Sequence, residues 1–415
     1  MNHLKLVWLL LLISLSQVAW AEWSYSGHAS LLLNQTLYEA DDIPSIIGGG
    51  TDYKDIDSNL RLNLKRQWQD WDFTVQYQVA VMTGDSIKLP ASVSPFSSGK
   101  LGSDAGRLWN LSSELRNDAS GLWLHRLDRL NLGYTSGDWA VRVGRQAISW
   151  GNGISFHPLD IFNPFSPLSL DTEYKTGDDM VYLQRSLPQQ RDLQIIYLPR
   201  RDTLSGVLDG SKDSLAMKLH SSTAQGDWDL LLARHYNEQV YGIAYVRNVT
   251  SAVWRTDINM TQLNDGRTAW FVDSNMDYSW NWFEHNFYGY VEWFHNSLGQ
   301  KVPDLIALAS DTALLDRIQR GELYTLADNV FALGMMMELT PRWQTQFNLL
   351  HHPADGGAIL HATLHHDWQQ NASLLMGMSL PAGPRGSEYG GVYSEDAGAY
   401  FSSGQRLFLY VQYYY

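Results

Sequence analysis

The chain has 415 residues, a formal net charge of −14 at pH 7 and no cysteine. The negative charge argues against nucleic acid as a partner, and the absence of cysteine excludes a disulfide-stapled exported domain and a lipid-modified N-terminal cysteine. The mean hydropathy is −0.27, although the chain contains 17 Trp and 22 Tyr. A polar average with many amphipathic aromatic residues is typical of a transmembrane β-barrel, in which only alternate residues of each strand face lipid.

The first 21 residues have the pattern of a cleavable secretory signal peptide. Lys5 supplies a positive charge, an apolar run extends from Leu6 to Leu15, and the small residues Ala19 and Ala21 flank Trp20 before Glu22. The apolar run is too short to span a membrane as a helix. We therefore predict export, cleavage after Ala21, and a single domain over residues 22–415, because no linker rich in Pro, Ser or Gly divides the remainder.

The mature chain consists of segments in which apolar and polar residues alternate, for example 59–65, 72–81, 214–220 and 269–280. Such alternation indicates strands with one apolar face, and a soluble β-sandwich would share it. The separators between segments favour a barrel, because short turns and longer loops alternate along the chain. Many of the short turns contain Trp. The short turns are 69–72, 136–139, 188–191, 225–229, 248–251, 280–284, 340–343 and 366–370. The longer separators are 39–57, 84–121, 149–177, 201–212, 262–266, 295–327, 352–357 and 381–404, with a tight turn at 237–239.

These separators predict about eighteen strands of roughly ten residues each, the length that a tilted transmembrane strand needs. Sixteen strands remain an alternative if the segments around 238–261 are not two strands. The predicted fold is an all-β, antiparallel up-and-down barrel with short periplasmic turns and long extracellular loops. Trp residues at the short turns would form an aromatic girdle at the boundary of the lipid. The predicted location is the outer membrane of a Gram-negative cell.

The chain ends on the sequence LFLYVQYYY, residues 407–415, in which every second residue is apolar or aromatic. In an open sheet this segment would be an apolar edge, whereas in a closed barrel it pairs with the first strand, 25–37. A terminal aromatic residue preceded by apolar residues at alternate positions also resembles the signal that the barrel-assembly machinery recognises. The resemblance assigns that role to Tyr413 and Tyr415.

The segment 149–177 is the most distinctive separator because it is apolar, aromatic and rich in proline. An outer loop exposed to water would be more polar, so we expect this loop to fold against the inner wall of the barrel as a constriction. A lid packed on other loops outside the mouth is the alternative. From spacing alone, Arg142 should project inward near the root of the loop. Arg145 breaks the alternation, which indicates either a bulge or a local pairing with Asp160 or Asp171. The candidate constriction residues are Arg142, Arg145, Trp150, Phe156, Asp160, Asn163 and Pro164.

The pattern G-R-Q-x-x-x-W-G at Gly144 to Gly151, followed by D-x-x-N-P at Asp160 to Pro164, resembles a motif of Gram-negative outer-membrane porin-like proteins. These proteins are similar to the alginate-export family of monomeric barrels. The resemblance covers a small part of the chain and implies a conduit, with a monomer favoured. The resemblance would imply a strongly basic lumen that serves as a pathway for an acidic polymer. The charges of this chain depart from that pattern.

The expected lumen charges are mixed rather than uniformly basic. Our lumen-facing candidates are Arg61, Lys65, Lys218, Arg255, Asp273 and Asp277, together with Arg129, Arg142, Arg406, Asp192, Asp257, Glu292 and Glu338. This mixture argues against an acidic polysaccharide as cargo.

The sequence contains no pattern of a serine nucleophile, a zinc protease or a phosphate-binding loop, so we expect neither an enzyme nor a cofactor. His361 and His365 share a strand face but are four residues apart, about 13 Å, and cannot hold one metal ion together. The acidic run 171–179 is expected to be a solvated loop. Residues 298–329 predict a short amphipathic helix that either closes the pore or binds a partner outside.

These features predict an outer-membrane channel, porin-like, for passage of small solutes or export of a substrate. The main alternative is a conduit or scaffold that works with an export system of the periplasm or inner membrane, and a barrel enzyme is the third. The expected partners are outer-membrane lipid, the assembly machinery and the transported solute.

Overall fold

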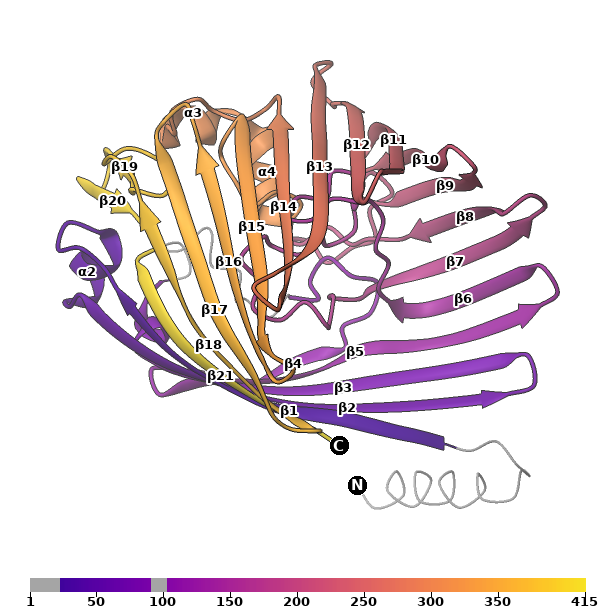
Figure 1. Cartoon of the computed structure of the whole chain (residues 1–415), viewed down its shortest axis with the longest axis horizontal. Helices are drawn as coiled ribbons and strands as arrows, with labels where there is room; N and C mark the ends of the chain where they lie inside the picture. Colours follow the sequence, from indigo (N-terminus) through magenta and orange to yellow (C-terminus); the bar gives the residue numbers. More distant parts are fainter. Residues whose placement is uncertain (1–22, 91–102) are drawn as a thin grey trace.

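The protein was analysed as a computed structural model, which describes residues 23–90 and 103–415. The predicted signal peptide, 1–21, lies outside the described residues, as do residues 91–102 of the predicted loop 84–121. The described chain forms a closed antiparallel barrel of eighteen strands (Figure 1). The barrel strands are β1 (Trp23–Leu37), β2 (Asp52–Trp68), β3 (Trp71–Gly84), β5 (Gly121–Ser136), β6 (Trp139–Gln146), β7 (Asp178–Leu187), β8 (Arg191–Leu198), β9 (Ser214–Thr223), β10 (Gly226–His235), β11 (Glu238–Val249), β12 (Ala252–Gln262), β13 (Thr268–Trp282), β14 (His285–Asn296), β15 (Asn329–Thr340), β16 (Trp343–His352), β17 (Gly357–Gln369), β18 (Ala372–Ala382) and β21 (Gln405–Tyr414).

The barrel closes where the last strand meets the first, as the sequence predicts. Strand β21 pairs with β18 on one side and with β1 on the other, with His28 opposite Tyr414 and Leu37 opposite Gln405. The N–H groups of Gly27 and Tyr415 each donate to the carbonyl oxygen of the other at 3.0 Å. Closure leaves no free strand edge along the seam, which removes the edge that an open sheet would expose.

The strand boundaries confirm the alternation of short turns and long loops. All eight predicted short turns join consecutive strands, from the turn between β2 and β3 to the turn between β17 and β18. The turn between β13 and β14 has positive φ at both Phe283 and Glu284, 47° and 63°, the geometry of a type I′ turn that matches the twist of paired strands. We call this end of the barrel the short-turn end and the opposite end the loop end.

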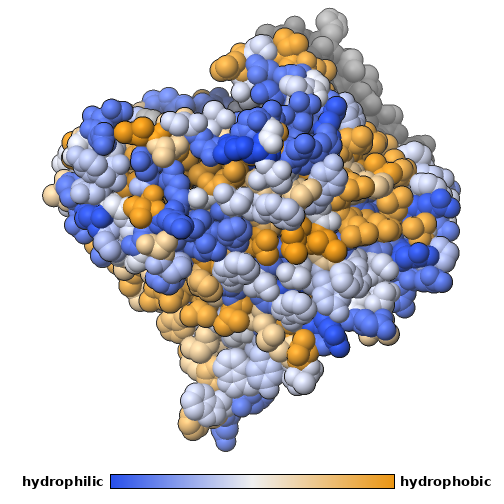
Figure 2. All heavy atoms as spheres, turned by 90° about the horizontal axis from the view of Figure 1, so that it is seen from above, coloured by the Kyte–Doolittle hydropathy of each residue, from blue (hydrophilic) through white to orange (hydrophobic). Residues whose placement is uncertain are grey.

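The outer wall is apolar, as a membrane barrel requires. Alternate side chains of the last strand, including Leu407, Tyr413 and Tyr415, are exposed, whereas Phe408 and Tyr410 point inward and are buried. Exposed Trp side chains gather near the short turns, at positions 68, 71, 139, 228, 282 and 368. Figure 2 shows hydrophobic patches between more polar regions of the surface. None of the described helices is long and apolar enough to cross a membrane.

One irregularity of the wall positions functional side chains. Gln76 and Tyr77 of β3 are adjacent, but their partners on β5 are Arg129 and Leu127, so Asp128 is the extra residue of a β-bulge. The short strand β4 (Ser112–Asp118) pairs with the start of β5, while β6 pairs with its end. Strand β4 therefore continues the wall on the loop side of β6.

The loops carry little regular structure of their own. They contain α2 (Ile43–Gly48), the 3-10 turn η2 (Ser86–Lys88), α3 (Leu305–Ser310), α4 (Thr312–Arg320), and the hairpin of β19 (Val392–Ser394) and β20 (Ala399–Phe401). The predicted amphipathic helix within 298–329 is present as the pair α3 and α4. Asp304 and Asp311 start these helices by accepting N–H groups of the first turn.

Candidate functional site

The loop between β6 and β7 lies inside the barrel. In Figure 1 its trace runs between the strands on the right and those on the left, and its hydrogen bonds fix the position. The carboxylate of Glu292 on β14 accepts the backbone N–H groups of Ile154, Ser155 and Phe156 at 2.9 to 3.2 Å. Glu292 is 3% exposed, so three backbone donors satisfy a buried charge that would otherwise be costly.

A second carboxylate holds the same limb of the loop. Asp257 on β12 accepts the N–H of Asn152 at 2.7 Å and its side-chain amide at 3.3 Å. Next to it, the Asn259 amide donates to the carbonyl of Pro158 at 2.7 Å. The inner wall from β12 to β14 thus binds residues 152–158 mainly through the loop backbone.

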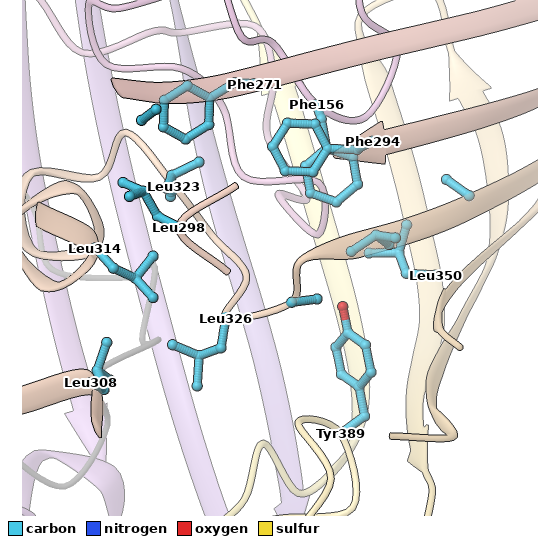
Figure 3. Close-up of a cluster of buried hydrophobic side chains, with 14 of the residues drawn as sticks. Phe156, Phe271, Phe294, Leu298, Leu308, Leu314, Leu323, Leu326, Leu350 and Tyr389 are labelled. Carbon is cyan, nitrogen blue, oxygen red and sulfur yellow. The ribbon is translucent and has the colours of Figure 1, made fainter. Parts of the chain in front are cut away.

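Apolar packing adds to these hydrogen bonds. Trp150, Leu159 and Phe162 are 2 to 3% exposed and pack with Ile196 and Leu231 of the wall. On the other side of the limb, Phe156 stacks on Phe294 of β14, with ring centroids 4.5 Å apart and planes 5° apart (Figure 3). A loop with this much buried aromatic surface is held as a fixed part of the lumen.

An internal ion pair joins the two limbs of the loop. The ammonium group of Lys175 lies 2.6 Å from a carboxylate oxygen of Asp160 and also donates to the carbonyl of Ile148. Burial raises the pKa of Asp160 to about 6 and lowers that of Lys175, in opposition to the attraction between the two charges. The pair closes the base of the loop. Asn163 and Pro164 follow, and the Asn163 amide donates to Asp178 at 2.8 Å.

The predicted pairing of Arg145 with Asp160 or Asp171 is wrong. Arg145 makes a bidentate contact with Asp179, which lies directly opposite on β7, at 2.8 and 3.0 Å. It also donates to Asp104 at 2.8 Å. Strand register brings Asp179 opposite Arg145, and Asp160 forms its ion pair with Lys175 instead. The break in alternation coincides with Gly144, whose φ is 122°, a conformation that favours glycine.

The prediction of a solvated acidic run also fails for its second half. Asp178 and Asp179 are 6% and 1% exposed. Asp178 accepts the Arg107 guanidinium at 3.0 Å and lies 3.7 Å from that of Arg200. These buried ion pairs join the loop base to the rim formed by residues 103–111. Asp171 and Glu173, in contrast, lie on the part of the loop that remains more open to solvent.

A cluster of arginines meets the return limb on the other side of the lumen. The bulge residue Asp128 lies 2.9 Å from Arg61, 2.8 Å from Arg129 and 3.4 Å from Arg126. The Arg61 guanidinium lies 4.0 Å from the centroid of the Tyr174 ring, and Arg129 donates to the carbonyl of Lys175. The loop therefore spans the lumen, with acidic side chains binding one limb and basic side chains the other.

The remaining predicted charges lie on the lumen side of their strands, in different surroundings. Lys218 lies near the loop, 5.8 Å from the Trp150 ring, and Arg255 pairs with Asp277 at 3.1 Å. Asp273 is fully buried and accepts the Asn275 amide at 2.7 Å.

Arg142 points inward but does not lie at the loop root. It is level with Asp72, at 3.7 Å, because both residues lie opposite Gly133 near the short-turn end. Together with Lys65 they line a cavity of about 420 Å³.

A second loop, 297–328, packs on the first from the loop end. The Tyr324 hydroxyl donates to the Pro164 carbonyl at 2.8 Å, and Glu322 contacts His235 of β10 at 2.9 Å. Leu314 of α4 and Leu326 are fully buried. Figure 3 shows these leucines with Phe271, Phe294 and Tyr389 in one cluster. The sequence left the position of this segment open.

Apart from Arg142, the candidate constriction residues lie in the loop or at its base and help to fix it in place. Trp150, Phe156, Asp160 and Pro164 are buried or nearly so, and Asn163 ties the loop base to β7. Sequence reasoning missed Arg126, Asp128, Tyr174 and Lys175. The interruption of alternation in the sequence R-L-D-R, residues 126–129, was the available sign of the bulge. No three His, Asp or Glu side chains are placed to hold a metal ion in the part of the chain that the structure describes.

The overall fold matches solved barrels at low sequence identity. OccAB2 of Acinetobacter baumannii has a TM-score of 0.54 and 9% identity, with 95% of this chain and 98% of that chain covered. A BenF-like porin from Pseudomonas fluorescens Pf-5 has a TM-score of 0.51 and 8% identity, with 96% of this chain and 99% of that chain covered. Pseudomonas aeruginosa OccK5 (OpdH) has a TM-score of 0.53 and 8% identity, with 94% of this chain and 97% of that chain covered.

The chain has a porin fold. No family model matches the sequence, and no curated protein matches it. The similarity to the solved porins is therefore a similarity of backbone fold. The side-chain contacts that hold the loop across the lumen are described from the residues of this chain alone.

Proposed function

We propose that this porin-type barrel is a channel of the Gram-negative outer membrane that passes small solutes, with loop 149–177 as its constriction. The observation that carries the proposal is the binding of three loop N–H groups by Glu292 inside the lumen. A loop fixed across the lumen narrows the path and brings solutes close to the charges of the wall. The apolar outer face supports a position in the membrane.

We further propose that the preferred solutes are small and anionic. Asp257 and Glu292 are occupied by the loop backbone, whereas the exposed Lys65 and the half-exposed Arg142 line the cavity at the short-turn end with Asp72 as the acidic side chain beside them. Pseudomonas aeruginosa OccK2 (OpdF), another structure with a similar fold, is described as a complex with glucuronate. Glucuronate is therefore a suitable first solute to test on this chain.

The resemblance to the alginate-export family remains a second candidate. Its motif residues are found at the base of the loop, where Arg145 binds Asp179 and Asp160 binds Lys175. Two inward loops that pack together favour passage of small solutes over a polymer. We also propose that the barrel acts as a monomer. The assembly machinery is proposed to recognise Tyr413 and Tyr415.

The test is single-channel conductance of the purified protein in a planar bilayer. Deletion of residues 154–168 should raise the conductance, because the deleted segment lies across the lumen. A matched control deletes residues 203–208 of the loop between β8 and β9, where Leu204 is 96% exposed, and should leave the conductance unchanged. If both deletions fold as heat-modifiable barrels and neither alters the conductance, the constriction is disproved.

A further inference from the structure

Three arginines on the outer wall lie opposite tryptophans across neighbouring strands. Arg66 of β2 is opposite Trp23 of β1, Arg185 of β7 is opposite Trp139 of β6, and Arg247 of β11 is opposite Trp254 of β12. Each arginine lies close to the short turn that ends its strand. The same geometry thus recurs at three places around the barrel.

The alternation of the strands points these side chains away from the lumen. Arg185 shares its face with the exposed Val181, and Arg247 shares its face with the exposed Tyr241 and Ile243. Arg66 follows the exposed Leu60 and Leu62 by the same two-residue step. They are therefore cations on the membrane-facing surface, in the ring of exposed tryptophans near the short turns.

For two of the three arginines, Arg66 and Arg185, the side-chain contacts place the cation over an aromatic ring, whereas Arg247 is related to Trp254 by strand register alone. The guanidinium carbon of Arg66 is 5.1 Å from the Trp23 ring centroid and 5.7 Å from that of Trp68, and that of Arg185 is 4.8 Å from Trp139. Among the described residues, the Nε of Arg66 is buried and has no hydrogen-bond partner, so only the terminal nitrogens of this guanidinium can meet a ligand. Stacking on a ring leaves the terminal NH2 groups, at the edge of a guanidinium, free to donate to an anion.

No acidic side chain on the same surface neutralises these arginines. At the outward-facing strand positions next to the short turns, the described residues include no Asp or Glu. The acidic residues Asp70, Asp138 and Glu284 lie in the turns, beyond the strand ends. On the outer wall at the loop end, Lys54 has Asp52 at 3.3 Å. The outward-facing strand positions beside the short turns thus carry positive charge without an acidic side chain among the described residues.

We propose that Arg66, Arg185 and Arg247 bind the phosphate groups of anionic phospholipids in the leaflet around the short-turn end. Tryptophan lies at the boundary between hydrocarbon and headgroups, and an arginine beside it can extend to the headgroup level while its stem stays on apolar surface. A guanidinium binds phosphate through parallel N–H donors. The inference requires the barrel to lie in a bilayer and does not depend on which solute passes through it.

Native mass spectrometry of the purified full-length mature barrel can test this, after titration with phosphatidylglycerol or phosphatidylcholine in the same detergent. The wild type should retain phosphatidylglycerol in preference. Each of Arg66→Gln, Arg185→Gln and Arg247→Gln should weaken retention about fivefold at its own site, since a basic residue near an anionic surface contributes about 1 kcal/mol. The matched control is Arg234→Gln, which removes an exposed arginine of β10 at the loop end and should change nothing.

Equal retention of the two lipids by the wild type would overturn the proposal, as would unchanged retention in all three variants. Heat-modifiable mobility selects the variants that have folded, and the three single substitutions make the test independent of any one of them. The conductance of Arg185→Gln and Arg247→Gln should equal that of the wild type. A barrel that binds phosphatidylglycerol through these arginines but never conducts would refute the proposed channel and leave this inference standing.

Discussion

The carboxylate of Glu292 accepts the backbone N–H of Ser155 with both oxygens, at 3.0 and 2.9 Å, although the residues are 137 positions apart. Glu292→Gln removes the charge and one of the acceptor oxygens. Hydrogen bonds to a charged group contribute about 2 kcal/mol each, so the loop should leave its position more often. We expect larger current fluctuations and a higher mean conductance in planar bilayers.

The control for this prediction is Glu338→Gln, another inward-facing glutamate, which contacts Asn286 near the short-turn end and does not touch the loop. It should behave as the wild type does. If the current fluctuations and mean conductance of Glu292→Gln equal those of Glu338→Gln, apolar packing alone holds the loop.

Arg142→Glu should move ion selectivity toward cations. The Arg142 side chain is 43% exposed and lines the cavity shared with Lys65, so reversal of its charge changes the potential that a passing ion meets. Folding should be little affected because its contact with Asp72 is long, 3.7 Å. The measurement is the reversal potential in a salt gradient. An unchanged reversal potential would place the ion path away from this cavity.

The sequence predicted the barrel well because strand alternation is a local property. Residues two apart in a strand, such as Leu407 and Leu409, lie on the same face, so their apolar character identifies the face that meets lipid. Strand number and all eight short turns therefore followed from the residues alone. The wall contacts of Glu292 and Asp257 could not follow in this way, because they depend on which distant segments a long loop reaches.

Removal of Leu407 to Tyr415 should prevent assembly. The truncation deletes all but the first two residues of β21 and leaves most of the facing backbone groups of β1 and β18 unpaired. Each unsatisfied group in hydrocarbon costs several kcal/mol. We expect degradation and loss of the barrel from isolated outer membranes, measured by immunoblot. Normal levels of a heat-modifiable truncated barrel would contradict closure through β21.

The packing of the last loop should depend on pH through Glu388. This carboxyl accepts Thr325 Oγ1 at 2.9 Å and Leu326 N at 3.0 Å, and burial raises its pKa to about 7 from an ordinary 4.5. A raised pKa in the folded state means that its stabilising contribution is complete below about pH 4.5 and is lost as the pH rises through about 7. The loop 383–404 should therefore loosen at pH 8.5.

Trypsin cleavage after Arg385 reports this loosening. The rate at pH 8.5 relative to pH 6 should be higher for the wild type than for Glu388→Gln, in which nothing titrates at this position, and the variant also corrects for the pH dependence of trypsin itself. Equal ratios for both proteins would show that Glu388 does not control the loop.

Asp128 is the carboxylate that balances Arg61, Arg126 and Arg129, and only a β-bulge places it among them. Asp128→Asn should lower the unfolding free energy by about 3 to 5 kcal/mol, since uncompensated charges are left buried. Arg126 has the longest contact with Asp128, 3.4 Å, and its Nε donates to Gln78. Adding Arg126→Gln to Asp128→Asn should therefore restore part of the stability, because one excess charge is removed. Urea unfolding of the barrel in lipid vesicles measures both effects, and equal midpoints for the wild type and Asp128→Asn would mean that solvent or an ion, rather than this carboxylate, balances the arginines.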